Sequence, residues 1–314
     1  MQIFTIGWNP AIDRILRCCE FRPGTHQKVQ LVARLAAGKA ANVSRALALL
    51  GINSIAAGIM GRDEAAFFSQ QLEALEPGKV QCRWVLTDQH TRENITVLSD
   101  RAPRDTHLSE EGFHLTDAYI AALENQLTSQ IRSGDVAVFA GSLPAGLSAA
   151  RYASILDQLL QSGVLVAVDT SGEALREALK RPLWAVKPNL EELSEALGQT
   201  IANDPLAIIA ALKSEDIHPE NILVSRESAG AVLFSRTGCW SGNLQMSGPI
   251  ISTVGCGDYL LAGFVAGAIG DLGGPKLLST ALALASLRAL SPDPAAFDVG
   301  QIGRLSELAQ VTPL

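Results

Sequence analysis

The sequence Thr253-Val254-Gly255-Cys256-Gly257-Asp258 runs directly into the apolar segment Tyr259-Leu260-Leu261-Ala262-Gly263-Phe264. The two glycines permit a tight turn, and the apolar run predicts a helix, so consecutive N–H groups should point into one anion-binding concavity. A carboxylate placed in an anion-binding site can act as a proton acceptor. Phosphoryl transfer needs such a proton acceptor for the attacking hydroxyl, next to hydrogen-bond donors that stabilise the transferred phosphoryl group. The residues alone leave an ordinary glycine turn, with Asp258 as helix N-cap, as an equal alternative.

Strand-like apolar runs alternate with helical patterns along the rest of the chain, which is typical of βαβ units and a parallel sheet. We expect strands at 3–7, 54–59, 136–140, 164–168, 184–186 and 222–225. We expect helices at 42–50, 63–75, 117–130, 148–161, 205–212, 257–270 and 275–290. Segments 28–35 and 91–99 interrupt this alternation as extra strands, and 227–230 is the expected hairpin turn between 222–225 and 231–235.

The composition narrows the class of protein. The 314 residues suffice for one large α/β domain or two smaller ones, and 47% of them are hydrophobic. The net charge of −7 argues against nucleic acid or an anionic membrane as the main partner. The five cysteines show no C-x-x-C spacing, and no apolar run reaches the roughly 18 residues of a membrane helix. We therefore expect a soluble, cytoplasmic protein.

The glycine-rich segment resembles the D-T-x-G-A-G-D signature of the PfkB/ribokinase family of sugar kinases. Four residues match, namely Thr253, Gly255, Gly257 and Asp258, whereas Ser252 and Cys256 replace the usual acid or amide and alanine. The resemblance implies a ribokinase-like, three-layer α/β fold with a mainly parallel central sheet and a small β-sheet lid. It makes Asp258 the catalytic base and the amides of Gly255, Cys256 and Gly257 the anion hole.

The resemblance extends from residue 9 to about residue 290 and implies a single kinase domain over 1–314. Its lid should be formed by segments near 14–36 and 90–108. In this family the lid often mediates dimerisation, so the resemblance also implies a homodimer through the lid.

The loop Asn9-Pro10-Ala11-Ile12-Asp13 follows the first expected strand, at the sheet edge where ligands bind in open parallel sheets. Asp13 could accept hydrogen bonds from sugar hydroxyls, or it could close an Asx turn. The N-P-A-x-D pattern resembles the first loop of the phosphosugar-kinase branch, where the aspartate binds the sugar.

Two further segments resemble acceptor-binding motifs of this branch. Residues 37–43 resemble G-G-K-G-x-N-V, with Ala37 and Ala40 in place of glycines, and Thr91-Arg92-Glu93-Asn94 resembles T-R-x-N. The resemblance assigns Gly38, Asn42 and Asn94 to the substrate, and Lys39 and Arg92 to a phosphate that the acceptor already carries. Each cation alone would be an ordinary surface residue. The usual T-E-I-N motif appears only as Thr106-His107-Leu108-Ser109.

The segment Lys187-Pro188-Asn189-Leu190-Glu191-Glu192 follows an expected strand and resembles the family's N-x-x-E motif. The resemblance implies that Lys187 and Asn189 contact ATP and that Glu192 organises Mg²⁺ through water. A capping box formed by Asn189 and Glu192 is the structural alternative, and the two roles are compatible. Ser225, Gly230 and Thr253 complete the predicted nucleotide contacts. Glu227 replaces a family glycine in this turn and would repel phosphate.

We therefore predict ATP-dependent, Mg²⁺-assisted phosphorylation of a sugar phosphate to a bisphosphate. The acceptor would be fructose 1-phosphate, fructose 6-phosphate or tagatose 6-phosphate, as in the 1-phosphofructokinase and tagatose-6-phosphate kinase branch. One alternative is a kinase of an unphosphorylated sugar or nucleoside in the same fold. Another is a weakly active sugar-phosphate-binding sensor, which the substitutions at Ala37, Ala40, Ser252 and Glu227 suggest.

Overall fold

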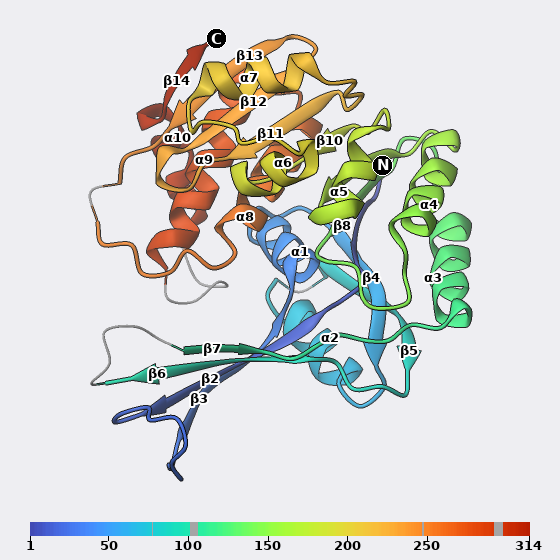
Figure 1. Ribbon diagram of the computed structural model, residues 1–314, viewed down its shortest axis with the longest axis vertical. Coiled ribbons are helices and arrows are strands. Elements are labelled where there is room, and N and C mark those ends of the chain that lie inside the picture. The colour runs from blue at the N-terminus through green and yellow to red at the C-terminus, as the bar shows by residue number, and fades with distance from the viewer. Residues whose placement is uncertain (77, 101–105, 247, 292–297) are drawn as a thin grey trace.

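The structure is a computed structural model that describes residues 1–76, 78–100, 106–246, 248–291 and 298–314 (Figure 1). Within these ranges a large sheet has the strand order β14-β13-β12-β11-β10-β9-β8-β1-β4-β5. The strands from β11 to β5 in this order run parallel, and β12, β13 and β14 are antiparallel. In chain order they are β1 (Ile3–Gly7), β4 (Ser54–Gly61), β5 (Val80–Thr87), β8 (Val136–Ala140), β9 (Leu165–Asp169), β10 (Ala185–Val186), β11 (Asn221–Ser225), β12 (Ala231–Ser235), β13 (Gly238–Asn243) and β14 (Gln310–Pro313).

Helices cover both faces of this sheet (Figure 1). One layer contains α1 (Lys39–Leu49), α8 (Cys256–Ile269), α9 (Gly274–Leu290) and α10 (Ile302–Leu308). The other contains α3 (Asp117–Gln130), α4 (Ala149–Gln161), α5 (Gly172–Leu179), α6 (Leu190–Leu197) and α7 (Pro205–Ser214). Alternate residues of one strand join different cores: Phe139 packs with α3 and α4, and Val138 packs with α8 and α9. Burial on both faces explains the continuous apolar runs and confirms the predicted three-layer α/β fold.

A smaller sheet projects from the body and has the order β3-β2-β6-β7 (Figure 1). Its strands are β2 (Ala11–Cys18), β3 (Gln30–Ala37), β6 (Glu93–Ser99) and β7 (Thr106–Ser109). In this sheet Asp13 is paired with Asn94, and Thr96 is paired with His107, so these side chains share one face. We call this four-stranded sheet the lid; that it closes over a substrate stays a prediction.

The remaining elements refine the expected boundaries. α2 (Ala65–Glu73) packs Phe68 against Trp84 of β5. α1 begins at residue 39, three residues before the expected start, because Gly38 at φ +102° supplies its N-cap. α8 begins at residue 256 with Gly255 as N-cap at φ +83°. Asp258 is therefore the third helical residue, and the alternative that it is the N-cap is wrong.

No helix in the described ranges is long and apolar enough to cross a membrane.

The β11–β12 turn contains a non-glycine residue in a left-handed conformation. As predicted, residues 227–230 join two antiparallel strands. Glu227 has φ +51°, whereas Gly230 at φ +89° is required because a Cβ there would lie 2.0 Å from the Gly242 oxygen. The left-handed region costs a non-glycine residue about 1–2 kcal/mol. Position 227 thus has a backbone conformation that suits glycine, although it carries the exposed carboxylate of Glu227.

We expect Glu227→Gly to stabilise the protein by about 1 kcal/mol, because relief of backbone strain exceeds the entropy cost of glycine. Calorimetry should show a rise in Tm of roughly 2 °C. Ser228→Gly is the matched control, since Ser228 does not have a positive φ and glycine there should only destabilise. A Glu227→Gly protein no more stable than the parent would contradict strain at this position.

Candidate functional site

The site is built where α1, α6 and α8 begin beside the carboxyl ends of β9 and β10. At its centre Asp258 is buried, with 5% of its surface exposed. The Asn42 side chain donates from Nδ2 to Oδ2 of Asp258 over 2.7 Å. The two residues are 216 positions apart, so the fold itself brings these two motifs together.

The start of α8 presents backbone donors beside Asp258. The amide of Cys256 donates to the Thr253 carbonyl over 3.3 Å, whereas those of Gly255 and Gly257 have no hydrogen-bond partner among the described residues. A Cβ at position 257 would lie 3.3 Å from Nζ of Lys187, so glycine allows the ammonium to approach the helix start. The start of α8 therefore suits the binding of an anion, because it combines two free amides, the positive end of the helix dipole and a nearby cation.

A charged cluster lies beside this helix start. Asp169, at the end of β9, has a side chain only 1% exposed. Its Oδ1 lies 2.6 Å from Nζ of Lys39, and its Oδ2 lies 3.0 Å from Nζ of Lys187. Nζ of Lys39 is also 3.6 Å from Oε1 of Glu192. The cluster thus joins α1, β9, β10 and α6 at one sheet edge.

The charges in and around this cluster set the protonation of its members. Burial raises the pKa of Asp258 to about 7, and the negative charge of Asp169 adds to this effect. The bond from Asn42 and the charges of Lys39 and Lys187 act in the opposite direction. Burial would also raise the pKa of Asp169, but the two lysines outweigh it and hold that pKa below its ordinary value. Asp258 is therefore poised to exchange a proton near neutral pH, and Asp169 stays ionised.

Lys39 is held as a cation by this arrangement. Burial alone would lower its pKa, but the carboxylates of Asp169, Glu192 and Asp258 raise it above the ordinary value.

A second group of predicted residues meets on the lid. The Asn94 amide donates to Oδ1 of Asp13 over 2.9 Å. Arg92 donates over 3.4 Å both to Oδ1 of Asn94 and to the Asn9 carbonyl. Burial raises the pKa of Asp13, although Asn94, Arg45 and Arg92 offset part of the effect. Burial also lowers the pKa of Arg92, and Asp13 partly compensates.

The two cations predicted to share an acceptor phosphate have different partners in the structure. Within the described residues Arg92 contacts Asn94 and Asn9, whereas the ion-pair partners of Lys39 are Asp169 and Glu192. Sequence reasoning also missed Asp169, because the expected strand ended at residue 168. An acidic residue that directly follows a buried run, at the carboxyl end of a parallel strand, is the signal that could have found it.

The predicted nucleotide residues occupy structural positions in the fold. Asn189 and Glu192 form the capping box of α6, with bonds of 2.7 and 2.8 Å. This confirms the structural alternative for the pair. Ser225 bridges to Asn189 and donates its amide to the Pro188 carbonyl, which places the β11 turn beside the start of α6. Thr253 is exposed in the loop before α8.

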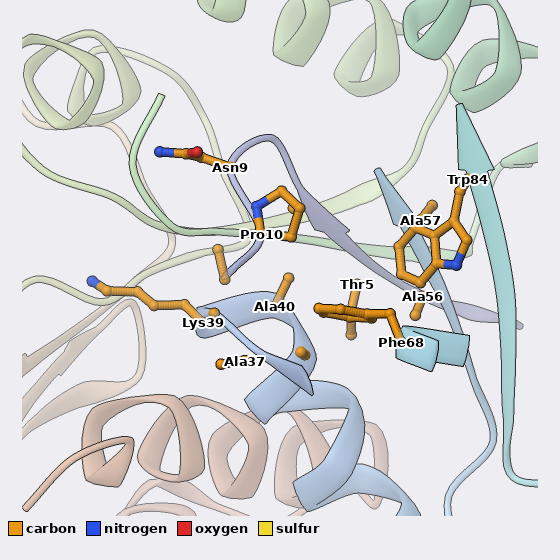
Figure 2. A pocket seen from close by; sticks show the side chains of 14 residues that line it. Thr5, Asn9, Pro10, Ala37, Lys39, Ala40, Ala56, Ala57, Phe68 and Trp84 are labelled. Carbon is orange, nitrogen blue, oxygen red and sulfur yellow. The ribbon is translucent and has the colours of Figure 1, made fainter. Parts of the chain in front are cut away.

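A partly open pocket lies beside Asn9 and Pro10, and its roughly 320 Å³ of empty space includes solvent at its mouth (Figure 2). Asn9, Pro10 and Lys39 lie at one end of it, and Phe68 and Trp84 lie at the other. The side chain of Lys39 extends away from the aromatic end (Figure 2). Its wall also contains small residues, among them Gly7, Gly38, Ala37, Ala40, Ala41, Ala56 and Ala57. The alanines at 37 and 40, which replace family glycines, therefore narrow this pocket.

Unpaired buried polar atoms concentrate around the site. In the described ranges six buried side-chain atoms have no hydrogen-bond partner. Asn9 Oδ1 and Arg92 Nε lie beside the lid, and Thr170 Oγ1 lies at the end of β9. Asp169 Oδ2, the fourth such atom near the site, makes no hydrogen bond but is ion-paired with Lys187. Such atoms are rare in a core, and their concentration marks a place that a polar ligand would complete.

The carboxylates of the site fit a hydrated divalent cation better than a preformed metal cage. Among the described residues no group of three or more His, Cys, Asp or Glu side chains is arranged to hold a metal. Mg²⁺ typically keeps several waters and uses one or two carboxylates together with substrate phosphates. Glu192 has one oxygen in the capping box and the other near Lys39, so it fits contact with such an ion through water.

An α/β body with a β-sheet lid, a buried carboxylate at a helix N-terminus and a lysine-rich sheet edge together define a kinase-like site. The profile described as "pfkB family carbohydrate kinase" matches residues 3–298. The chain belongs to this family of carbohydrate kinases.

Named relatives extend this result over the whole chain. A 1-phosphofructokinase of Vibrio cholerae is 31% identical, over 100% of this chain and 97% of the relative. A tagatose-6-phosphate kinase of Staphylococcus epidermidis is 29% identical, over 92% of each chain. Among solved structures, phosphofructokinase-2 from Escherichia coli in complex with substrates and products aligns with a TM-score of 0.89, covering 98% of this chain and 99% of its own. At 22% identity, that likeness supports the fold alone.

Proposed function

We propose that the protein transfers the terminal phosphoryl group of ATP to a hydroxyl of a sugar phosphate, forming a bisphosphate. The observation that carries the proposal is Asp258, buried at the start of α8, bonded to Asn42 and with a pKa raised to about 7. A general base works best when its pKa lies near the working pH. The relatives named 1-phosphofructokinase and tagatose-6-phosphate kinase support fructose 1-phosphate, fructose 6-phosphate and tagatose 6-phosphate as the acceptors to test.

In the proposed mechanism, ionised Asp258 accepts the proton of the acceptor hydroxyl as its oxygen attacks the terminal phosphorus of ATP. The new O–P bond forms while the bond to ADP breaks. The amides of Gly255 and Gly257 and the adjacent Lys187 stabilise negative charge on the transferred group. The amide of Cys256 lies in the same turn and would join them by exchanging its weak bond to Thr253 for the phosphoryl oxygen.

On the acceptor side, Asp13, Asn94 and Asn42 would bind sugar hydroxyls, and Gly38 lets the loop approach the sugar. Arg92 would bind the acceptor's phosphate, because its Nε is buried without a partner and its other nitrogens make only 3.4 Å contacts. Lys39 is already paired with Asp169 and Glu192. We therefore place Lys39 between donor and acceptor, where it would neutralise the migrating phosphoryl group.

On the donor side, the start of α6 and the β11 turn would bind ATP. Lys187 and Asn189 would face its phosphates, and Ser225, Gly230 and Thr253 would line the adjacent turns. Glu192 would hold Mg²⁺ through water. When bound, Mg²⁺ neutralises phosphate charge and orients the terminal group for attack.

The exposed apolar side chains of the lid support a homodimer. Leu31 and Val32 on β3 and Leu108 on β7 are 52%, 48% and 50% exposed, and packing of two lids against each other would remove such side chains from water. A sedimentation mass of one chain at micromolar concentration would contradict this association.

The substrate assignment is tested by measuring ADP release with Mg-ATP against fructose 1-phosphate, fructose 6-phosphate, tagatose 6-phosphate, fructose, ribose and adenosine. We expect saturable turnover on a phosphosugar and none of comparable kcat/KM on the last three. Preference for an unphosphorylated acceptor would assign the chain to another branch of the family. Binding of a sugar phosphate without turnover would favour the sensor alternative.

We expect Asp258→Asn to lower kcat at least ~10²-fold, since the general base is lost. In the parent protein, kcat/KM should fall below an apparent pKa near 7, because only ionised Asp258 accepts the proton. This fall of kcat/KM at low pH is distinct from the effect of protonating the substrate's phosphate monoester, whose second pKa is roughly 6. A turnover near that of the parent would remove Asp258 from the mechanism.

The stability of the same variant separates chemistry from folding. The folded-state pKa of Asp258 lies above its unfolded value of 3.8. Its contribution to stability is therefore fully present below about pH 3.8 and is lost as pH rises through about 7. Asp258→Asn should thus be at least as stable as the parent at pH 8, as measured by thermal unfolding.

We expect Arg92→Ala to raise KM for the phosphosugar roughly 10- to 100-fold, the loss typical of a charged hydrogen bond to phosphate. Lys39→Ala should mainly lower kcat, with KM changed only a few-fold. Arg14→Ala is the matched control, because Arg14 pairs with Glu93 on the opposite face of the lid. An equal rise in KM in Lys39→Ala and Arg92→Ala would show that both lysine and arginine hold the acceptor phosphate.

A further inference from the structure

A buried arginine holds the partner of the proposed base. Arg45 lies on α1, one turn after Asn42, and only 4% of its surface is exposed. Its Nη1 donates to Oδ1 of Asn42 over 2.6 Å, and its Nη2 donates to the Ala36 carbonyl over 2.7 Å. The opposite end of the same Asn42 amide donates to Asp258. A continuous chain of hydrogen bonds therefore runs from the end of lid strand β3, through Arg45 and Asn42, to Asp258.

The chemistry of this chain allows only one orientation of the amide. An arginine side chain carries donors and no acceptor, so the Asn42 atom that faces it must be the oxygen. The Nδ2 group must then face Asp258, where it donates to the ionised carboxylate. With the amide rotated by 180°, two acceptor oxygens would face each other at Asp258, and two sets of donors would meet at Arg45.

We propose that Arg45 is a positioning residue for phosphoryl transfer, which fixes the Asn42 amide so that it holds Asp258 ionised and aimed at the acceptor. The inference rests on the proposed role of Asp258 as the base. The alignment of the base then depends on the Arg45 guanidinium, which contacts neither of the proposed substrates.

The second donor of Arg45 ties this alignment to the lid. Ala36 is paired with Ile12 in the lid sheet, next to the pairing of Leu35 with Asp13. The charge of Arg45 also acts on Asp13, where it counters the rise in pKa caused by burial. One buried cation thus connects the strand that carries the acceptor-binding carboxylate with the helix start that carries the base.

The test compares Arg45→Met, Arg45→Gln and Arg45→Lys with the parent. Methionine removes the donors, and glutamine can present either a donor or an acceptor, so both free the Asn42 amide to rotate. We expect kcat to fall roughly tenfold and the acid limb of kcat/KM to move up by about one pH unit, the size expected when one hydrogen bond to a charged group is lost. Arg45→Lys keeps a cation with donors only and should recover most of the parent profile.

The pH profile distinguishes this role from a purely structural one. The other charged groups that act on Asp258, namely Asp169, Lys39 and Lys187, are unchanged in these variants. Arg181→Met is the matched control: Arg181 is 17% exposed and bonded to Asp157 and Glu177, so its loss should reduce stability without moving the acid limb. If Arg45→Met does not fold, Arg45→Gln carries the test.

The outcomes separate this inference from the proposed function. If Asp258→Asn abolishes turnover but the methionine and glutamine variants keep the parent's acid limb, the role of Arg45 is overturned and the base assignment stands. A shift of equal size in the lysine variant would also overturn it. If Asp258→Asn turns over like the parent, the base assignment fails and the positioning role fails with it.

Discussion

The burial of Asp169 between two lysines is the constraint on which the rest of the site depends. A carboxylate with 1% of its side chain exposed is tolerated only when it is paired, and both of its oxygens face ammonium groups at 2.6 and 3.0 Å. These pairs draw Lys39 at the start of α1 and Lys187 after β10 to the end of β9. With Glu192 and Asp258 included, three carboxylates face two lysines. Because the direct ion pairs go to Asp169, the burial of Asp258 is only partly compensated, and its pKa rises to about 7.

The pairing of both lysines with Asp169 determines how readily Asp258 can take up a proton. Asp258 would be an unreactive ion if a lysine contacted it directly, since a close cation would lower its pKa and its basicity. Here the lysines bind Asp169 instead, and the direct partner of Asp258 is the neutral amide of Asn42. The same lysines remain close enough to lower the pKa of Asp258 from where burial alone would place it. A carboxylate with a pKa near 7 therefore follows from its burial together with the pairing of both lysines to the neighbouring Asp169.

The sequence predicted those parts of the fold whose signal is local. Strands β1, β8 and β12 and helix α3 have the expected bounds, because continuous apolar runs and turn residues mark them clearly. Strands β13 and β14 were missed, since short antiparallel strands near the sheet edge bury few side chains and leave little apolar pattern. The first residues of β2 were missed because residues 9–13 are read as a loop after the first strand, although lid pairing makes residues 11–13 extended.

In the site, too, local features could be predicted from the sequence and long-range contacts could not. Asp258, Asn42 and the N-x-x-E pair could be identified from short motifs, but their contacts could not. The partner of Lys39 is 130 residues away, and nothing near residue 39 in sequence indicates that Lys39 pairs with Asp169. The capping box at Asn189 could be predicted because both residues lie within one turn of a helix. Spacing within an element is thus readable from sequence, whereas pairing between the ends of different strands requires the sheet order.

The hydrogen-bond chain from Ala36 to Asp258 also bears on how the kinase would avoid wasting ATP. Water can attack ATP whenever an ionised base and bound nucleotide are present without an acceptor, so selectivity requires that the base be aligned only when the acceptor site is formed. Asp13 and Ala36 belong to paired lid strands, and Arg45 joins Ala36 to the partner of Asp258. A displacement of β3 that disturbs Asp13, the carboxylate proposed to bind the acceptor, would then also release the Asn42 amide. Acceptor binding and base alignment would be lost together, which favours transfer to the sugar over transfer to water.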